Sequence, residues 1–284
     1  MAGRIAVVTD STAYLPEGLA ERLGVAIVPL HVIINGVSGV EGVEVWPADV
    51  ARALSDRRGS VQTSRALPDD FAATFSSTMD GGATGVVAVL MSSALSGTYE
   101  SARSAAEQCG GESLVRVVDS RSTAMGLGFA VIAAAEMAKD GGSLPEVYSA
   151  AVRAAGRTTM LFYVDTLEHL RRGGRIGTAQ ALLGTALSVK PILTVADGAI
   201  VLKEKVRTAS RAMARLEALA AEAARESTVD IAVHHLAAEA KAAALADRLK
   251  EQLPRLRRLY ASEIGAAVGA HVGPGLLGVV VARL

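Results

Sequence analysis

Short apolar runs rich in valine and isoleucine alternate with longer amphipathic stretches along the chain. The first run is Ile5 to Val8, a helical pattern follows from Pro16 to Arg22, and a second apolar run extends from Val25 to Val32. This alternation of strand-sized and helix-sized patterns predicts βαβ units. The run Gly85 to Met91 is almost wholly apolar, as expected of a parallel strand with both faces buried.

The same reading extends to the rest of the first half of the chain. The segment Gly36 to Trp46 alternates Val with Gly and Glu, which predicts an exposed hairpin. Helices are predicted at Pro47 to Leu54, Pro68 to Ser76, Gly97 to Gln108, Ala124 to Lys139 and Leu144 to Ala155, and a strand at Leu114 to Val118.

The pattern changes after a strand predicted at Met160 to Val164. Asp197-Gly198 separates two apolar runs, Val189 to Val195 and Ile200 to Lys205, which is a strong signal for an antiparallel hairpin. Helices are predicted at Asp165 to Arg172, Gln180 to Leu187, Thr208 to Ala224 and Ala237 to Gln252, and strands at Asp230 to His234, Arg257 to Ala261 and Gly278 to Leu284. We therefore expect an α/β fold of two domains, residues 1–160 with a parallel sheet and residues 161–284 with a mixed sheet.

Composition narrows the class of protein. Half of the 284 residues are hydrophobic, enough for a sizeable core, and 29 Lys and Arg balance 29 Asp and Glu, which argues against nucleic acid as a partner. The single cysteine, Cys109, favours a reducing compartment and offers no metal cluster. The first apolar run has no cleavage site after it, and no run approaches the roughly 20 residues of a membrane span, so we expect a cytoplasmic protein.

Polar clusters follow the predicted strands, where open α/β sheets place their ligands. They are Thr9 to Thr12, Thr63-Ser64, Ser92 to Tyr99 and Asp119 to Ser122. In the third cluster, serines lead into Ser96-Gly97 at a helix start, a geometry that can bind an anion. The alternative is that these serines only cap the helix. Neither G-x-x-x-x-G-K-[ST] nor G-x-G-x-x-G occurs at a strand end, so nucleotide binding has no motif.

Two glycine-rich segments carry a basic side chain. Arg175 follows Gly173-Gly174, where a helix is expected to end in a left-handed cap. Its guanidinium could pair with a carboxylate, a phosphate or a neighbouring domain. The alternative is that it forms only a surface salt bridge. His271 lies between glycines that would let a ligand approach its ring; the alternative is a core histidine. His234-His235 lacks the spacing of a zinc site.

Taken together, these motifs resemble the DegV family. They are VTDST, TS before a proline, SSALSGTYESA, VVDSRSTAMGLG, LEHLRRGGRIG, KPIL with a following DG hairpin, VRT and GAHVGPGLLG, in order over nearly the whole chain. The resemblance implies a three-layer α/β/α first domain with a parallel sheet and a two-layer second domain with a mixed sheet. It also implies a long-chain fatty acid, bound by its carboxylate with the acyl tail buried.

In this family the chain would be the binding subunit of a fatty acid kinase. A separate catalytic subunit would use ATP to phosphorylate the bound acid for phospholipid synthesis, so that this chain would need no cofactor and would not itself be an enzyme. Transient contact with a membrane surface, where fatty acids are collected, is compatible with this role.

The resemblance also assigns the site residue by residue. Thr63, Ser93 and His271 match the family's carboxylate contacts, with Ser64 beside Thr63 and with Ser96 and Gly97 as backbone donors. Arg175 matches an arginine at the pocket mouth and kinase contact. The chain departs from the family at Arg65-Ala66, where Gln-Pro is usual, and at Ala270 and Val272, where the family has threonines.

Two other functions stay open from the sequence. One is an acyl-transfer hydrolase with Ser93 as nucleophile and His271 as base, although no G-x-S-x-G elbow and no acidic orienter is evident. The other is a sugar-binding domain like that of dihydroxyacetone kinases, which would require a histidine that attacks the ketone.

Overall fold

The computed structural model describes residues 3–56, 58–182 and 189–284 and divides into two units. Unit 1 is Met1–His31 with Ser64–Arg157, and unit 2 is Val32–Thr63 with Thr158–Leu284. The expected boundary at residue 160 lies close to the break between the units at residue 157. The two expected domains were each one continuous segment, whereas in the structure residues 32–63 belong to unit 2. The reason is packing, because helix α2 (Pro47–Ser55) lies against helix α10 (Ala266–Val272).

Unit 1 is built on a four-stranded parallel sheet in the order β2-β1-β6-β7. The strands are β1 (Ile5–Asp10), β2 (Val25–Val28), β6 (Gly85–Leu90) and β7 (Val115–Asp119). Every residue of the central strand β6 is buried, as its uninterrupted apolar sequence predicts.

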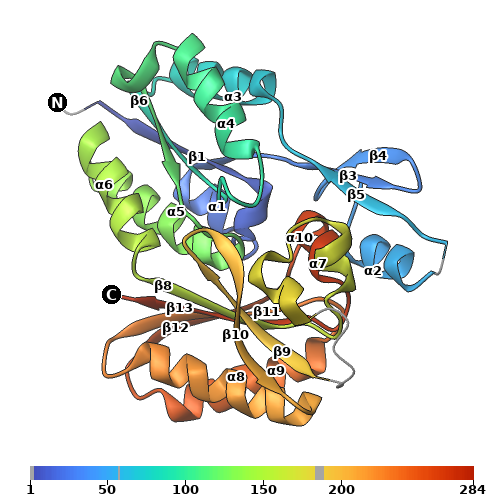
Figure 1. Ribbon diagram of the computed structural model, residues 1–284. Helices are drawn as coiled ribbons and strands as arrows, with labels where there is room; N and C mark the ends of the chain where they lie inside the picture. The colour runs from blue at the N-terminus through green and yellow to red at the C-terminus, as the bar shows by residue number, and fades with distance from the viewer. Residues whose placement is uncertain (1–2, 57, 183–188) are drawn as a thin grey trace. The chain divides into compact units, whose positions relative to one another are not determined.

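Helices cover both faces of this sheet (Figure 1). One face carries α3 (Pro68–Asp80) and α4 (Thr98–Gln108), and the other carries α5 (Ala124–Lys139) and α6 (Leu144–Ala155), while the short α1 (Leu19–Leu23) contacts β2 and α5. The 3₁₀ turns η1 (Ser11–Ala13) and η2 (Gly111–Ser113) follow β1 and precede β7. The predicted three-layer α/β/α domain with a parallel sheet is therefore confirmed.

Unit 2 contains a six-stranded sheet in the order β10-β9-β8-β13-β11-β12, in which only β11 and β12 are parallel. Its strands are β8 (Thr158–Tyr163), β9 (Lys190–Ala196), β10 (Ala199–Val206), β11 (Val229–His235), β12 (Leu256–Glu263) and β13 (Leu277–Arg283). Asp197 and Gly198 join β9 to β10 with φ angles of +49° and +81°, as a tight hairpin turn requires.

Helices α8 (Ala209–Ala224) and α9 (Glu239–Gln252) cover one face of this mixed sheet, below it in Figure 1. Their apolar sides pack on β11 and β13 in a buried cluster that includes Leu216, Ile231, Leu245 and Val279. Thr208 begins α8 by accepting a hydrogen bond from the backbone N–H of Arg211. The predicted two-layer domain with a mixed sheet is confirmed.

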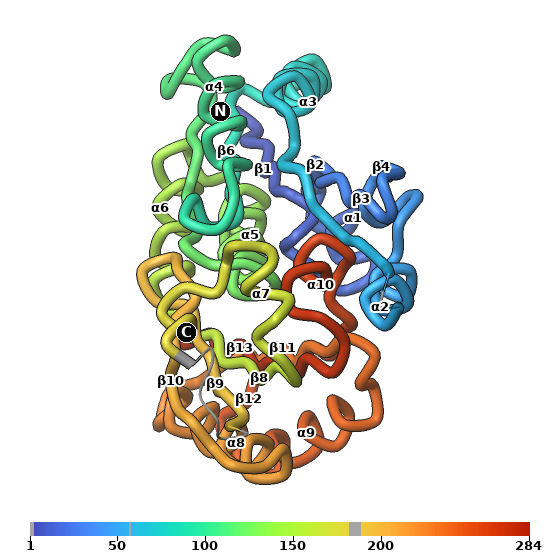
Figure 2. The backbone as a smooth tube through the Cα atoms, turned by 45° about the vertical axis from the view of Figure 1, so that its right-hand side comes forward, coloured from blue at the N-terminus to red at the C-terminus, as the bar shows by residue number. Residues whose placement is uncertain are grey.

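The rest of unit 2 consists of short elements. They are the three-stranded sheet β4 (Val37–Val40), β3 (His31–Ile34) and β5 (Val61–Ser64), helices α2, α7 (Glu168–Arg172) and α10, and the 3₁₀ helix η3 (Gly177–Leu182). Helix α10 packs against both α2 and α7, and Figure 2 shows α2 beside it. These contacts bring residues from three distant parts of the sequence together.

The strand expected from Val25 to Val32 is two strands in different sheets. Strand β2 ends before Pro29 and β3 begins after Leu30. Proline has no backbone N–H to donate to a neighbouring strand, which explains the break between the two sheets.

The expected hairpin also begins earlier than the interval from Gly36 to Trp46. Asn35 and Gly36 join β3 to β4 with φ angles of +52° and +84°. Asn-Gly is a strong signal for a two-residue hairpin turn, so the sequence contained the information.

Other boundaries differ in a similar way. Helix α7 begins at Glu168 and not at Asp165. Of the helix expected at residues 180–187, residues 180–182 belong to the 3₁₀ helix η3, and residues 183–187 lie outside the described part of the chain. Strand β5 and helix α10 were not predicted. Gly269, inside α10, obscured this short helix, because glycine lowers helix propensity.

Candidate functional site

The centre of the candidate site in unit 2 is the contact between Thr63 and His271. The hydroxyl oxygen of Thr63, on β5, lies 2.9 Å from Nε2 of His271, in the last turn of α10. Both residues were expected from the sequence to take part in one site, and the structure brings them into hydrogen-bonding contact.

Helix α10 is held in place by the segment that carries Thr63. Glu41, which is only 6% exposed, accepts a hydrogen bond of 2.7 Å from the backbone N–H of Ala267 in the first turn of α10. A carboxylate at a helix start satisfies a free N–H group and complements the helix dipole. Gly269 faces Val50 of α2 and Leu236, where it allows close approach. The position of His271 is therefore fixed by residues 32–63.

The ring of His271 packs against Gly173, at the end of α7. A Cβ atom added to Gly173 would lie 2.1 Å from Nδ1 of His271, which is too close for any side chain. Similarly, a Cβ on Gly273 would lie 2.2 Å from a ring atom of His169. Each of these glycines thus allows one imidazole ring to pack closely against the backbone. Gly174, with φ of +72°, provides the predicted left-handed cap.

His271 is neutral at physiological pH. Burial, and then the positive charge of Arg175, lower its pKa to about 4. A neutral imidazole carries its single proton on one nitrogen only, and Nδ1 is buried without a hydrogen-bond partner in the described part of the chain. A buried N–H without an acceptor is more costly than a buried lone pair, which favours the proton on Nε2.

This tautomer sets the direction of the contact with Thr63. With the proton on Nε2, His271 donates to the Thr63 oxygen, and the hydroxyl proton of Thr63 is left for a ligand. The pair can therefore present one oriented hydroxyl donor, as a carboxylate or another acceptor group would require.

Arg175 lies next to this pair without belonging to it. Its guanidinium donates to the carbonyl oxygen of Gly173, and its side chain is half-buried. Arg171 and Arg172 instead pair with Glu168, at 2.6 and 2.8 Å, on the exposed side of α7. These two pairs lower the pKa of the Glu168 carboxyl to about 2, and they are the solvated charges that the sequence indicates.

The polar clusters of unit 1 lie at the carboxyl edge of its sheet, and Ser93 is paired there with Asp119. The Ser93 hydroxyl donates to Oδ2 of Asp119 at 2.6 Å, and the Ser93 backbone N–H donates to Oδ1 at 3.3 Å. Ser93 is exposed and stands in the loop after β6, whereas Asp119 ends the adjacent strand β7. The sequence placed Asp119 in a polar cluster but gave it no role.

Ser92 and Ser96 lie in the loop between β6 and α4, and Gly97 is the N-cap residue of α4. The hydroxyl of Ser92 accepts from the N–H of Ala94 at 3.2 Å, and that of Ser96 accepts from the N–H of Thr98 at 3.3 Å. Both bonds are local, and α4 itself has no side-chain cap, because its N-cap residue is Gly97. Arg65 lies against Gly97, since a Cβ there would be 2.7 Å from its Nη1.

Two other candidate residues have local bonds. The hydroxyl of Ser64 donates to the carbonyl oxygen of Arg65 at 3.3 Å, a weak contact. Asp10 is fully buried and joins two strand ends, because it accepts from the N–H and hydroxyl of Thr12 and from the N–H of Met91. Burial raises the pKa of the Asp10 carboxyl. The first polar cluster therefore holds the loop together.

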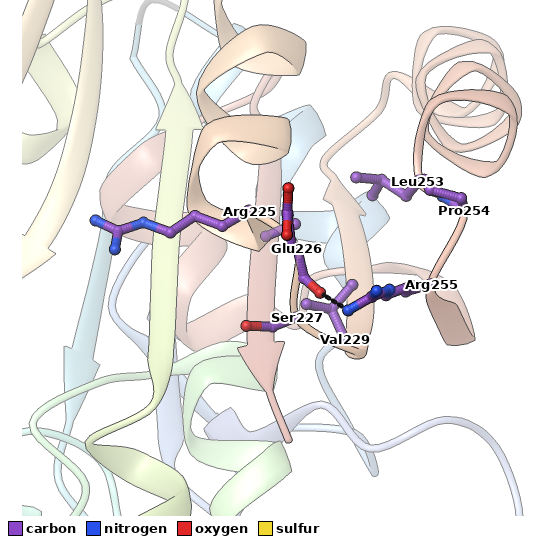
Figure 3. A pocket seen from close by; sticks show the side chains of 8 residues that line it. Arg225, Glu226, Ser227, Val229, Leu253, Pro254 and Arg255 are labelled. Atoms are coloured by element: carbon purple, nitrogen blue, oxygen red, sulfur yellow. Dashed lines mark hydrogen bonds between the residues drawn. The ribbon is translucent and has the colours of Figure 1, made fainter.

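A hollow of about 280 Å³ lies elsewhere in unit 2, at the ends of α8 and α9 (Figure 3). Its arginines do not converge: Arg255 donates to the carbonyl oxygen of Glu226, while the guanidinium of Arg225 points away from the other labelled side chains. None of the expected site residues lines it. It is not a candidate for the site.

Within residues 3–56, 58–182 and 189–284, no group of three or more His, Cys, Asp or Glu side chains is placed to hold a metal ion. Over the same described residues, none of the helices has the length and apolar character needed to cross a membrane.

Comparison with known proteins agrees with this fold. The model of the DegV family matches residues 4–284. The DegV domain-containing protein SCO2569 of Streptomyces coelicolor is 52% identical over 281 residues, and the alignment covers 99% of both chains.

Two solved structures are similar over their whole length. One is a DegV family protein from Thermus thermophilus described as fatty acid binding, with a TM-score of 0.93, 32% identity and coverage of 99% of this chain and 100% of that chain. DegV of Bacillus subtilis, described as a fatty acid binding protein, has a TM-score of 0.89, 31% identity and the same coverage. The chain therefore belongs to the DegV family.

Proposed function

We propose that this protein binds a long-chain fatty acid by its carboxylate and presents it to a separate, ATP-dependent fatty acid kinase. The observation that carries the proposal is the Thr63–His271 pair, in which a buried neutral imidazole orients a hydroxyl donor. The relatives from Thermus thermophilus and Bacillus subtilis, both described as fatty acid binding, support the choice of ligand.

The carboxylate would be bound by hydroxyl donors. Thr63 supplies one and His271 keeps that hydroxyl oriented. Ser93 supplies a second when its hydroxyl proton turns from Asp119 to the ligand. Ser64, Ser96 and Gly97 are the remaining proposed contacts. A carboxylate bound by a few hydroxyl and N–H donors needs no cation, and burial of the tail contributes on the order of 0.8 kcal/mol for each methylene group. Binding energy would thus come mainly from the tail and head-group specificity from the hydroxyls.

Native mass spectrometry of the purified protein, with extraction of bound lipid, tests the ligand directly. We expect a fatty acid to co-purify and added palmitate to raise the melting temperature. Thr63→Val should reduce palmitate affinity roughly tenfold, since loss of a donor to a buried charge costs about 1–3 kcal/mol. Thr84→Val, at an exposed threonine of unit 1, is the matched control and should leave affinity unchanged.

Absence of any acyl chain, with no thermal shift on adding palmitate, would refute the proposal. Turnover of an ester by the protein alone, abolished in Ser93→Ala, would favour the hydrolase instead. The structure gives that alternative no specific support, because the Ser93 hydroxyl donates to Asp119.

Presentation to a kinase depends in this proposal on Arg175. Arg175→Ala should keep palmitate affinity within about threefold, because a charge beside the binding groups mainly affects association with partners, while phosphorylation of bound palmitate by a kinase subunit falls strongly. Arg171→Ala, which removes a solvated charge of the preceding helix α7, is the control. A large loss of palmitate affinity in Arg175→Ala would contradict this division of roles.

A further inference from the structure

The Ser93 hydroxyl already has an anionic acceptor. Its oxygen lies 2.6 Å from Oδ2 of Asp119, the length of a strong hydrogen bond from a hydroxyl to a carboxylate. A serine hydroxyl has one proton only. While that proton points to Asp119, Ser93 offers a ligand its lone pairs and no donor.

Asp119 is held in this position by the backbone. Its Oδ1 accepts from the N–H of Ser93 at 3.3 Å and from the N–H of Arg121 at 2.8 Å. The two loops involved follow β6 and β7, which are adjacent parallel strands with Leu90 opposite Asp119. Because its carboxylate bridges both loops, Asp119 cannot turn away from Ser93 without breaking these bonds.

A carboxylate that binds Ser93 must therefore compete with Asp119. The hydroxyl proton has to rotate from one anion to the other, and the two like charges then share the same hydroxyl. Both changes oppose binding of an anionic head group, whereas a neutral head group meets no such repulsion.

From this geometry we propose that Asp119 is a specificity-determining positioning residue that competes with the ligand carboxylate for the Ser93 hydroxyl. It weakens binding of fatty acids relative to lipids with the same chain and a neutral head group, and so keeps the bound acid exchangeable. The inference rests on the proposed binding of a fatty acid at Ser93.

Asp119→Asn is the sharpest test, because the amide keeps Oδ1 for both backbone N–H groups. Its Nδ2 replaces Oδ2 and donates to Ser93, so that the bond reverses and the Ser93 proton is free for the ligand. We expect palmitate to bind about tenfold more tightly, equivalent to about 1.4 kcal/mol, and methyl palmitate to change less than about threefold.

Two controls separate the expected gain in palmitate affinity from the effect of removing any negative charge and from a change in protein stability. Asp140→Asn removes an exposed charge at the far end of α5 and should not change palmitate affinity. In a Ser93→Ala background, Asp119→Asn should give a clearly smaller gain, because the hydroxyl that it frees is gone.

Unchanged or weaker palmitate binding by Asp119→Asn, an equal gain for both lipids, or the full gain in the Ser93→Ala background would each overturn the proposal. If Asp119→Asn does not fold, Asp119→Ser also removes the charge and carries the same expected sign. Palmitate binding by the native protein is measured in the same titrations, so failure of the proposed function is recognised separately.

Discussion

Thr63 and His271 are 208 residues apart in the chain, and the Thr63 hydroxyl oxygen lies 2.9 Å from Nε2 of His271. The imidazole is neutral, and its other nitrogen is buried without a hydrogen-bond partner in the described residues. The relationship makes His271 an orienting group for Thr63 within unit 2, and the sequence alone had suggested only that both contact a carboxylate.

His271→Ala should weaken palmitate binding roughly tenfold, because the Thr63 hydroxyl loses the donor that orients it, a loss worth about 1–3 kcal/mol. His271→Gln should restore affinity to within about threefold of the native value, since its amide nitrogen can replace Nε2 as the donor. Isothermal titration calorimetry measures both.

The same measurement in a Thr63→Val background completes a double-mutant cycle. There His271→Ala should have little further effect, because it acts through Thr63. Equal losses in His271→Ala and His271→Gln would contradict this relay and indicate that the ring contacts the ligand directly.

Gly173→Ala should destabilise the protein by about 1–3 kcal/mol, since the added Cβ meets the His271 ring and must displace it. The φ of Gly173 is −74°, so the backbone itself accepts alanine and the effect is steric. Gly156→Ala, where the nearest atom would be 3.6 Å away, is the control and should be neutral. Chemical denaturation measures the free energy of unfolding of both variants. Equal stability of Gly173→Ala and Gly156→Ala would contradict the packing argument.

Stability should rise with pH between about 4 and 6.5 because of His234 and His271. Burial lowers the pKa of both to about 4, from a usual value of 6.5. In that interval the unfolded chain binds more protons than the folded chain, so stability is lost as pH falls, by on the order of 2–3 kcal/mol for each histidine. Burial raises the pKa of the Asp10 carboxyl, so Asp10 contributes in the opposite sense at pH values above its usual pKa of 3.8.

Urea denaturation of the native protein and of His271→Gln across this pH interval isolates one of the two contributions. The variant should lose less stability on acidification than the native protein. If the stability of the native protein and that of His271→Gln changed with pH in the same way, the pKa of His271 would not be lowered in the folded protein.

Asp10→Asn should destabilise unit 1 by about 1–3 kcal/mol, because the amide leaves one of the buried donors at Thr12 or Met91 without an acceptor. The predicted effect is on thermal stability and not on head-group specificity. A specific change in affinity for palmitate over methyl palmitate, without loss of stability, would instead place Asp10 in the ligand site.

Much of the fold follows from local sequence patterns. The apolar strand β6, the helices α5 and α6 and the hairpin at Asp197-Gly198 all lie where periodicity and turn residues predict them. These features depend on neighbours within a few residues, which is why a single sequence contains them. Helix α10 escaped prediction because its glycines serve contacts with distant residues.

Local sequence patterns also predicted part of the candidate site. Ser96 and Gly97 were correctly placed at a helix start, and Ser93 in the loop before it, from the sequence alone. No local signal showed that the Ser93 hydroxyl would be occupied by Asp119, because the pairing of β6 with β7 creates that contact.

The sequence by itself thus determined the layered α/β architecture, the polar clusters at the strand ends and the family. Only the tertiary structure decided that residues 32–63 join unit 2, that His271 is neutral and bonded to Thr63, and that Asp119 holds Ser93. The physical reason is that secondary structure depends mainly on local periodicity, whereas burial, proton positions and competing hydrogen bonds depend on groups brought together from far apart in the chain.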